Sequence, residues 1–180
     1  SMFDIEPVGK AQLLENVGNQ SSLFQNGTDY IFKPSRIEKN NYISDLRSAE
    51  QAAAGENIFI RLGKLPIVYE KIGIPAGKVA TNKKIIIKDT VKKHNVPMDV
   101  VENLPELFAD PLIVLKSSDK STNPNAYVAV LDAVDKDGKQ MIAALSLTDS
   151  GKYHFITSFY GKNKIENMLS NALGENRVKY

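Results

Sequence analysis

Two short turns rich in aspartate and glycine constrain this chain most, because they separate three strand-forming runs between Asp110 and Lys162. The first turn, Asp135–Gly138, contains an Asp-Gly pair, and glycine adopts the positive φ of a tight hairpin turn at low cost. The second turn, Asp149–Gly151, has a similar composition. Runs joined by such short turns pair antiparallel with their neighbours. The sequence therefore predicts an antiparallel meander.

Composition limits the classes of function. The 180 residues suffice for one domain, or for one domain with an appended segment. The formal net charge is only +2, so any phosphate-binding surface is expected to be a local patch. The absence of cysteine excludes disulfides and thiolate metal sites, and the two histidines have no zinc-site spacing. No apolar run is long enough for a membrane span, and no signal-peptide pattern is seen.

Residues 1–57 are the least patterned third of the chain. We expect an N-terminal arm or subdomain of unknown role there, followed by the main domain at 58–180. Apolar side chains recur at helical spacing between Tyr42 and Ala54, and Gly55 is placed to end that helix. The other expectations are a turn, an apolar run ended by a proline and a polar loop, at Asn26–Asp29, Tyr30–Phe32 and Lys39–Asn41.

Proline and glycine delimit short elements in the middle of the chain. A helix is expected after Pro66, ending before Gly73. Another is expected after Pro97 and is broken or restarted at Pro105, ahead of a strand at Leu112–Leu115.

The segment between those two helices is predicted to be extended. Three isoleucines stand between lysines in Lys84–Lys88, and this composition favours a β-strand. Asp89 and Thr90 are then expected to cap a brief helical turn that runs to His94.

Alternation along the last strand predicts which side chains face the core, because neighbouring strand residues point to opposite faces. Tyr153, Phe155, Thr157 and Phe159 are expected on the core side, and His154, Ile156, Ser158 and Tyr160 on the other. A helix at Ile165–Leu173 should then pack on the sheet, with a short strand at Arg177–Tyr180. The predicted class is α+β: N-terminal helices, an antiparallel β-meander of four to five strands, and a C-terminal helix.

From about Leu62 onward the chain carries an ordered series of short motifs. They are Gly63-Lys64, Lys93-His94-Asn95-Val96-Pro97, Leu104-Pro105-Glu106-Leu107, Asp110-Pro111-Leu112-Ile113-Val114, the Asp-Gly hairpin and Ser158-Phe159-Tyr160-Gly161-Lys162. This series resembles the phage MuF C-terminal toxin domain, which is grouped with ribonucleases of the barnase/EndoU/colicin/RelE (BECR) type. The resemblance covers about two thirds of the chain. It implies a BECR, barnase-like fold and a metal-independent, RNA-cleaving toxin of bacterial or phage origin.

His94 is the first catalytic candidate. Cleavage through the ribose 2′-hydroxyl needs a general base and a general acid, and histidine has the unperturbed pKa nearest neutrality. Lys92, Lys93 and Asn95 adjoin it in the sequence and are the expected substrate-binding residues, able to hold a phosphate beside the imidazole. The alternative is a histidine without catalytic function that is favoured by the negative end of a helix dipole.

The Ser-x-Tyr-Gly-Lys motif supplies the other catalytic candidates through its resemblance to the family motif. The ammonium of Lys162 can stabilise the extra negative charge of a pentacoordinate phosphorane, and the hydroxyls of Ser158 and Tyr160 can orient a phosphate oxygen or relay a proton. Gly161 would let the backbone approach the ligand closely. The alternative makes Tyr160 a half-buried strand residue and Lys162 an ordinary solvated lysine.

The remaining charged residues are assigned structural roles. Lys83, Lys84 and Lys88 are expected to protect a strand edge, the alternative being that they line an RNA path. His154 is expected to face solvent, the alternative being a catalytic role. The aspartate-rich turn at Asp135 lacks the distal glutamate of a calcium loop, so neither a metal nor another cofactor is expected.

The leading hypothesis is an endoribonuclease toxin domain that cleaves RNA, with tRNA as one candidate, by transesterification to a cyclic phosphate. Its expected partners are RNA and a cognate immunity protein, and neither a membrane nor a small-molecule cofactor is expected. It would act in the bacterial cytoplasm after delivery within a larger secreted or phage-borne protein. The rival hypothesis is a catalytically inactive, phage-derived interaction module that binds a protein or RNA without cutting it.

Overall fold

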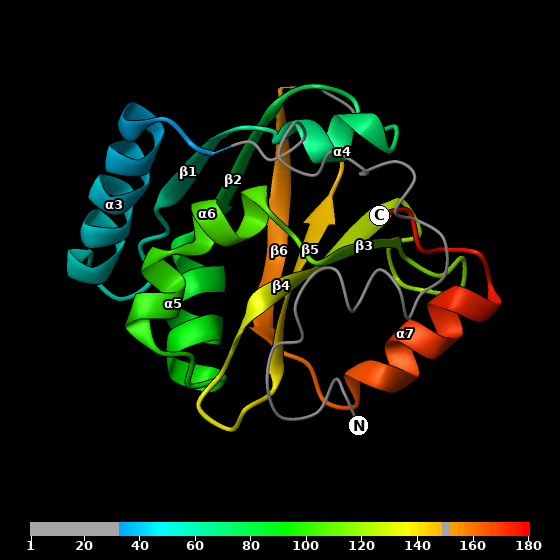
Figure 1. Cartoon of the computed structure of the whole chain (residues 1–180). Coiled ribbons are helices and arrows are strands. Elements are labelled where there is room, and N and C mark those ends of the chain that lie inside the picture. The colour runs from blue at the N-terminus through cyan, green and yellow to red at the C-terminus, as the bar shows by residue number, and fades with distance from the viewer. Residues whose placement is uncertain (1–32, 149–151) are drawn as a thin grey trace.

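The computed structural model describes residues 33–148 and 152–180 as a six-stranded sheet with helices packed on it (Figure 1). The strands are β1 Phe59–Lys64, β2 Lys78–Asn82, β3 Ile113–Lys116, β4 Ala126–Val134, β5 Gln140–Ser146 and β6 Tyr153–Gly161. The helices are α3 Arg36–Gln51, α4 Ile67–Lys71, η2 Lys84–Lys93, α5 Met98–Glu102, α6 Leu104–Ala109 and α7 Ile165–Gly174. The expected features at Asn26–Asp29, Tyr30–Phe32 and Asp149–Gly151 lie outside the described residues.

The α+β class and the meander are confirmed. The strand order is β1-β2-β6-β5-β4-β3, and β4, β5 and β6 pair antiparallel in succession. Gly138 has a φ of 78° in the turn between β4 and β5, as an Asp-Gly turn requires.

The sheet is larger than the four to five antiparallel strands expected, because β1 and β2, which are connected through α4, add an antiparallel pair to it. β2 pairs parallel with β6 over three residues, Lys78–Ala80 against Tyr153–Phe155. The sequence gives a weak signal here, since β1 carries Arg61 and Gly63 and its pairing with β2 is irregular between them.

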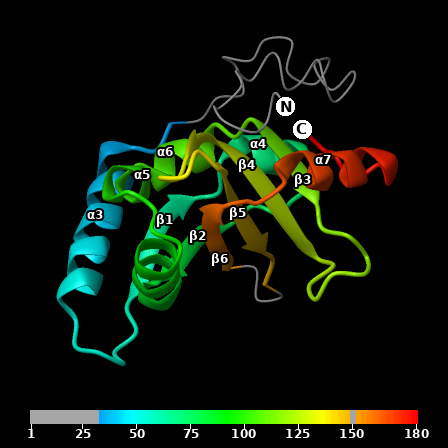
Figure 2. The same cartoon turned by 90° about the horizontal axis from the view of Figure 1, so that it is seen from below.

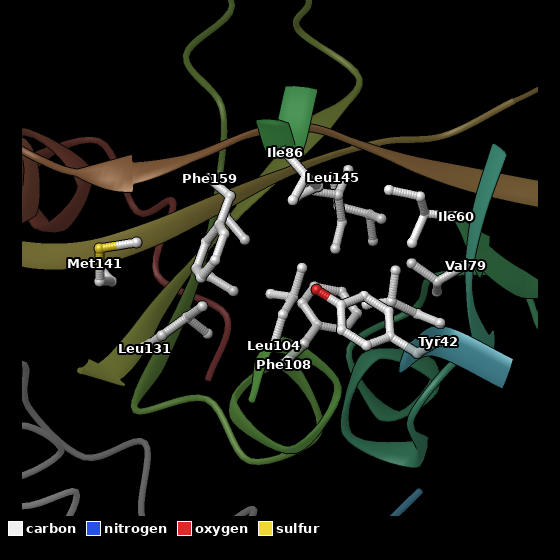
Figure 3. Close-up of a cluster of buried hydrophobic side chains, with 14 of the residues drawn as sticks. Tyr42, Ile60, Val79, Ile86, Leu104, Phe108, Leu131, Met141, Leu145 and Phe159 are labelled. Atoms are coloured by element: carbon white, nitrogen blue, oxygen red, sulfur yellow. The ribbon is translucent and has the colours of Figure 1, made fainter. Parts of the chain in front are cut away.

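Each face of the sheet has its own buried cluster. The larger one joins one face to α3, η2, α5 and α6; its members include Tyr42, Ile86, Phe108 and Phe159 (Figure 3). The smaller one lies between α7 and the opposite face, around Ile142 and Leu169. The two views also show α3 and α7 at opposite ends of the molecule (Figures 1 and 2).

Helix α3 begins six residues before the expected Tyr42, so the polar loop predicted at Lys39–Asn41 is wrong. Ser35 and Glu38 form a capping box, in which the Ser35 hydroxyl accepts from the Glu38 N–H and the Glu38 carboxylate accepts from the Ser35 N–H. These two bonds stabilise a polar first turn that has little apolar pattern. The helix ends at Gln51, and its buried side chains join the larger core.

The strand predicted at Lys84–Lys88 is also wrong, because this segment opens the π-helix η2. Ile86, Ile87 and Thr90 are buried, whereas Lys84 and Lys88 are exposed. This one-sided burial has helical spacing, and a run of three isoleucines is too short to distinguish strand from helix by itself.

The prediction of which β6 side chains face the core is wrong for the first half of the strand. His154 and Ile156 are buried, and Phe159 is buried as well, because the pairing with β5 shifts by one residue between Ile156 and Ser158. Such a β-bulge reverses which side chains face the core. His154 is therefore not solvent-facing: it is 1% exposed and its Nε2 lies 2.8 Å from the Pro75 carbonyl oxygen.

The cap expected at Asp89 and Thr90 is wrong as well, because both residues lie inside η2, whose N-cap is Lys83. The other elements agree with expectation. Pro66 precedes α4, Gly73 follows it with a φ of 101°, and Pro97 precedes α5. Helix α7 spans the predicted range, and the terminal segment pairs with β3 through the Leu115–Val178 bridge. Within the described residues, no helix has the length and hydropathy needed to cross a membrane.

Candidate active site

Helix η2 covers an edge of β6 that β2 leaves open. The parallel pairing with β2 ends at Phe155, so the β6 carbonyls beyond it need other donors. The Thr81 hydroxyl donates to the Ile156 carbonyl at 2.9 Å, and the Thr90 hydroxyl donates to the Phe159 carbonyl at 2.6 Å. The side chain of Ile86 packs in the same core as Phe159 (Figure 3). These contacts fix the end of η2 against the end of β6.

Substituting Thr90 by valine should lower the free energy of unfolding by about 1–2 kcal/mol, because the shape is kept while the buried Phe159 carbonyl loses its donor. Urea unfolding of the two proteins measures this difference. The exposed Thr157 gives a matched control, since its valine variant should change stability by less than about 0.5 kcal/mol. Equal stability of the Thr90 variant and the unaltered protein would contradict the role assigned to this hydroxyl.

His94 lies at the C-terminal end of η2, where its backbone N–H donates to the Asp89 carbonyl at 2.8 Å. Its half-buried ring stacks on the ring of Tyr160, with centroids 4.8 Å apart and planes 23° apart. The two residues are 66 positions apart in the sequence, and the docking of η2 on β6 brings them together. The imidazole and the phenol therefore share one site.

The turn between β4 and β5 forms another wall of this site. The Asp135 carboxylate accepts from the backbone N–H groups of Asp137 and Lys139, each at 2.9 Å, which fixes the turn. The Lys136 ammonium donates to the Asn95 side-chain oxygen at 3.0 Å. Asn95 has a φ of 55°, a conformation that asparagine tolerates better than most residues. Three segments far apart in the sequence thus meet around His94.

Gly161 packs directly against this turn. A Cβ atom at position 161 would lie 2.2 Å from Asp135 Oδ2 and 2.9 Å from Lys139 Cβ. Gly161 is thus required for the close approach of the backbone to the Asp135 side chain. The expected close approach of a ligand to the Gly161 backbone remains a prediction.

The other sequence-predicted residues flank the stacked pair. Ser158 is half-buried on β6, opposite Ala144, and Lys162 follows β6 with its N–H donating to the Gln140 carbonyl at 2.9 Å. Lys92 and Lys93 are exposed in the last turn of η2. In the described part of the chain, no hydrogen bond joins the side chain of Ser158 or Lys162 to His94.

Lys136 is the site residue that the sequence reasoning missed. It stands in the Asp-Gly turn, where the composition indicates a turn and nothing more. Only the packing of that turn beside Asn95 shows that its ammonium belongs to the same site as His94. No sequence signal distinguishes it from other exposed lysines.

The assembled groups suit proton transfer and the stabilisation of an anion. An imidazole and a phenol are in contact, the Lys136 ammonium reaches Asn95 beside His94, and the backbone of Lys162 pairs with Gln140 just beyond the end of β6. Across residues 33–148 and 152–180, no cluster of three or more histidine and acidic side chains is arranged to bind a metal.

A family model described as the phage MuF C-terminal domain matches residues 85–180, from the first turn of η2 to the last residue. The match includes both members of the stacked pair and the turn that carries Lys136. It does not include α3 or the β1–β2 pair. No curated protein and no solved structure shows a significant match to the chain.

Proposed function

Because the chain belongs to the phage MuF C-terminal domain family, we propose that it is a metal-independent endoribonuclease toxin domain. The reaction is the attack of a ribose 2′-oxygen on the adjacent phosphorus, with departure of the 5′-oxygen of the next nucleotide. A 2′,3′-cyclic phosphate and a 5′-hydroxyl result. The proposal is supported chiefly by the contact between His94 and Tyr160, which were both expected at the site.

The chemistry needs a group that accepts the 2′-hydroxyl proton and one that supplies a proton to the leaving oxygen. His94 is half-buried, and no hydrogen bond from the described residues engages its ring nitrogens, so they can exchange protons with a bound ligand. Tyr160 positions the phosphate or shares the proton transfer, together with Ser158 two residues earlier.

The phosphorane has one more negative charge than the phosphodiester, so fixed cations near it lower the barrier. Lys162 is assigned this role. Lys136 is the second cation, and its bond to Asn95 Oδ1 fixes its ammonium near the end of η2. A phosphate that enters the site would take over some of these donors.

RNA incubated with the purified protein in EDTA tests the proposal. Cleavage under chelation is the expected result, and tRNA is a suitable first substrate. RNA that is bound or protected but stays intact would contradict the proposal and favour the inactive interaction module. A cognate immunity protein, action in the bacterial cytoplasm and delivery within a larger protein are further parts of the proposed toxin function.

Replacement of Tyr160 by phenylalanine distinguishes the contribution of the hydroxyl from that of the ring, because only the hydroxyl is removed. The stack on His94 is kept, so the protein should remain as stable as before, while cleavage should fall by about tenfold through the loss of one hydrogen bond to a charged group. Single-turnover cleavage rates measure the effect. Unchanged rates in this variant would restrict Tyr160 to a packing role.

A further inference from the structure

A hollow of about 420 Å³ lies between η2 and the loop that follows α3. We call it the lysine hollow, because its lining contains Lys83, Lys84, Lys88 and Lys92 and a single carboxylate, that of Glu56. The whole chain has a formal net charge of only +2. Positive charge is therefore concentrated here, as expected for a surface that binds a polyanion.

Hydrogen bonds between its two walls hold the hollow open in one shape. The Lys83 ammonium donates to the Ala52 and Ala53 carbonyls, at 3.0 and 2.9 Å. The Lys83 backbone N–H donates to the Ile58 carbonyl at 2.9 Å, and the Asn57 side-chain oxygen accepts from the Lys84 N–H at 3.3 Å. A ligand would thus meet a preorganised surface.

The other three lysines are exposed and occur every fourth residue along the outer face of η2. The wall facing them contains Ala54 and Gly55, which have little or no side chain and leave room for a chain to pass. Lys92 lies in the last turn of η2, two residues before His94. The row of charges therefore ends one turn or less from the helix end where the imidazole meets Tyr160, although the two side chains leave the helix on different sides.

We propose that the lysine hollow binds the sugar-phosphate backbone of single-stranded RNA next to the scissile phosphate. This inference rests on the proposed ribonuclease function and adds the path of the substrate. A row of lysine ammonium groups can neutralise successive phosphates without reading the bases. The RNA segment bound in the lysine hollow would then contribute to affinity but not to sequence preference.

A 2′-O-methyl RNA oligonucleotide is the probe, because it lacks the 2′-hydroxyl and cannot be cleaved by transesterification. Its affinity is measured by fluorescence anisotropy at several salt concentrations, for the wild-type protein and the K84Q/K88Q variant. Two lost phosphate contacts should reduce the slope of log affinity against log salt by about 1.4, and the affinity at about 0.1 M salt by about 25-fold. The K78Q/K120Q variant removes two lysines that do not line the hollow, and it should bind as the wild type does.

Equal binding by K84Q/K88Q and wild type, or no binding by either, would overturn the inference. Polyglutamate that displaces the oligonucleotide as effectively as RNA does would also overturn it, in favour of an acidic protein partner. Cleavage of unmodified RNA by the wild-type protein is followed in parallel. Absence of cleavage by the wild-type protein contradicts the proposed function. Unchanged binding of the 2′-O-methyl oligonucleotide by K84Q/K88Q contradicts only the role of the lysine hollow.

Discussion

Replacing His94 by alanine should reduce RNA cleavage by about 10²–10⁴-fold, the usual contribution of a general acid or base. The expected effect is large because His94 is the only histidine at the described site, since His154 is a buried residue of β6 whose ring contacts the Pro75 carbonyl. His94 is half-buried and lies at a helix end, so the fold should survive the substitution. Cleavage rates and circular dichroism of the same preparation measure both effects.

A phenylalanine at position 94 is the matched control. It can stack on Tyr160 as the imidazole does, but it cannot carry a proton. His94→Phe should therefore keep the stability of the wild-type protein and lose as much activity as His94→Ala. Substantial cleavage by the phenylalanine variant would mean that His94 contributes by packing, and its assignment as a proton-transfer group would be wrong.

Replacing Gly161 by alanine should lower the free energy of unfolding by about 3 kcal/mol, the upper end of the usual range for an added methyl group in a packed site. The added methyl would collide with the Asp135 carboxylate, which two backbone hydrogen bonds hold in place. The turn that carries Lys136 would have to move, so activity should fall as well. Urea unfolding measures the first effect and RNA cleavage the second.

Gly174 provides the control for this experiment. A Cβ there would meet nothing within 4 Å, so Gly174→Ala at the end of α7 should be neutral or slightly stabilising. The collision itself is tested by a double-mutant cycle with Asp135→Ala, in which the cost of Gly161→Ala should shrink. Purely additive effects would show that the contact with Asp135 is not the cause.

The sequence was a good guide where a local pattern decides the structure. The Asp-Gly turn at position 138 needs a positive φ, and the apolar spacing of α7 has one consistent helical face. Neither feature depends on distant residues. The meander and its C-terminal helix were predictable for this reason.

The errors occurred where tertiary packing decides the structure. The isoleucines of Lys84–Lys88 suit a strand locally, but Ile86 and Ile87 are buried together only when the segment winds as a helix on β6. The bulge near Thr157 turns His154 inward, and its position depends on the register with β5. No periodicity within one strand predicts such a register shift.

The candidate site was predictable in part. Motif order connected His94 with Tyr160, and the structure brings their rings into contact. Lys136 was missed because its partner Asn95 belongs to another segment. The lysines around Lys88 were expected to protect a strand edge, and they instead line a hollow on a helix.

Analysis of the RNA ends tests the central claim most directly. A defined RNA is incubated in EDTA with the wild-type protein and with His94→Phe, and the termini of the fragments are identified by mass spectrometry. The account predicts 2′,3′-cyclic phosphate and 5′-hydroxyl ends from the wild-type protein, and intact RNA from the variant. Intact RNA with both proteins, or fragments that carry 5′-phosphate ends, would contradict it.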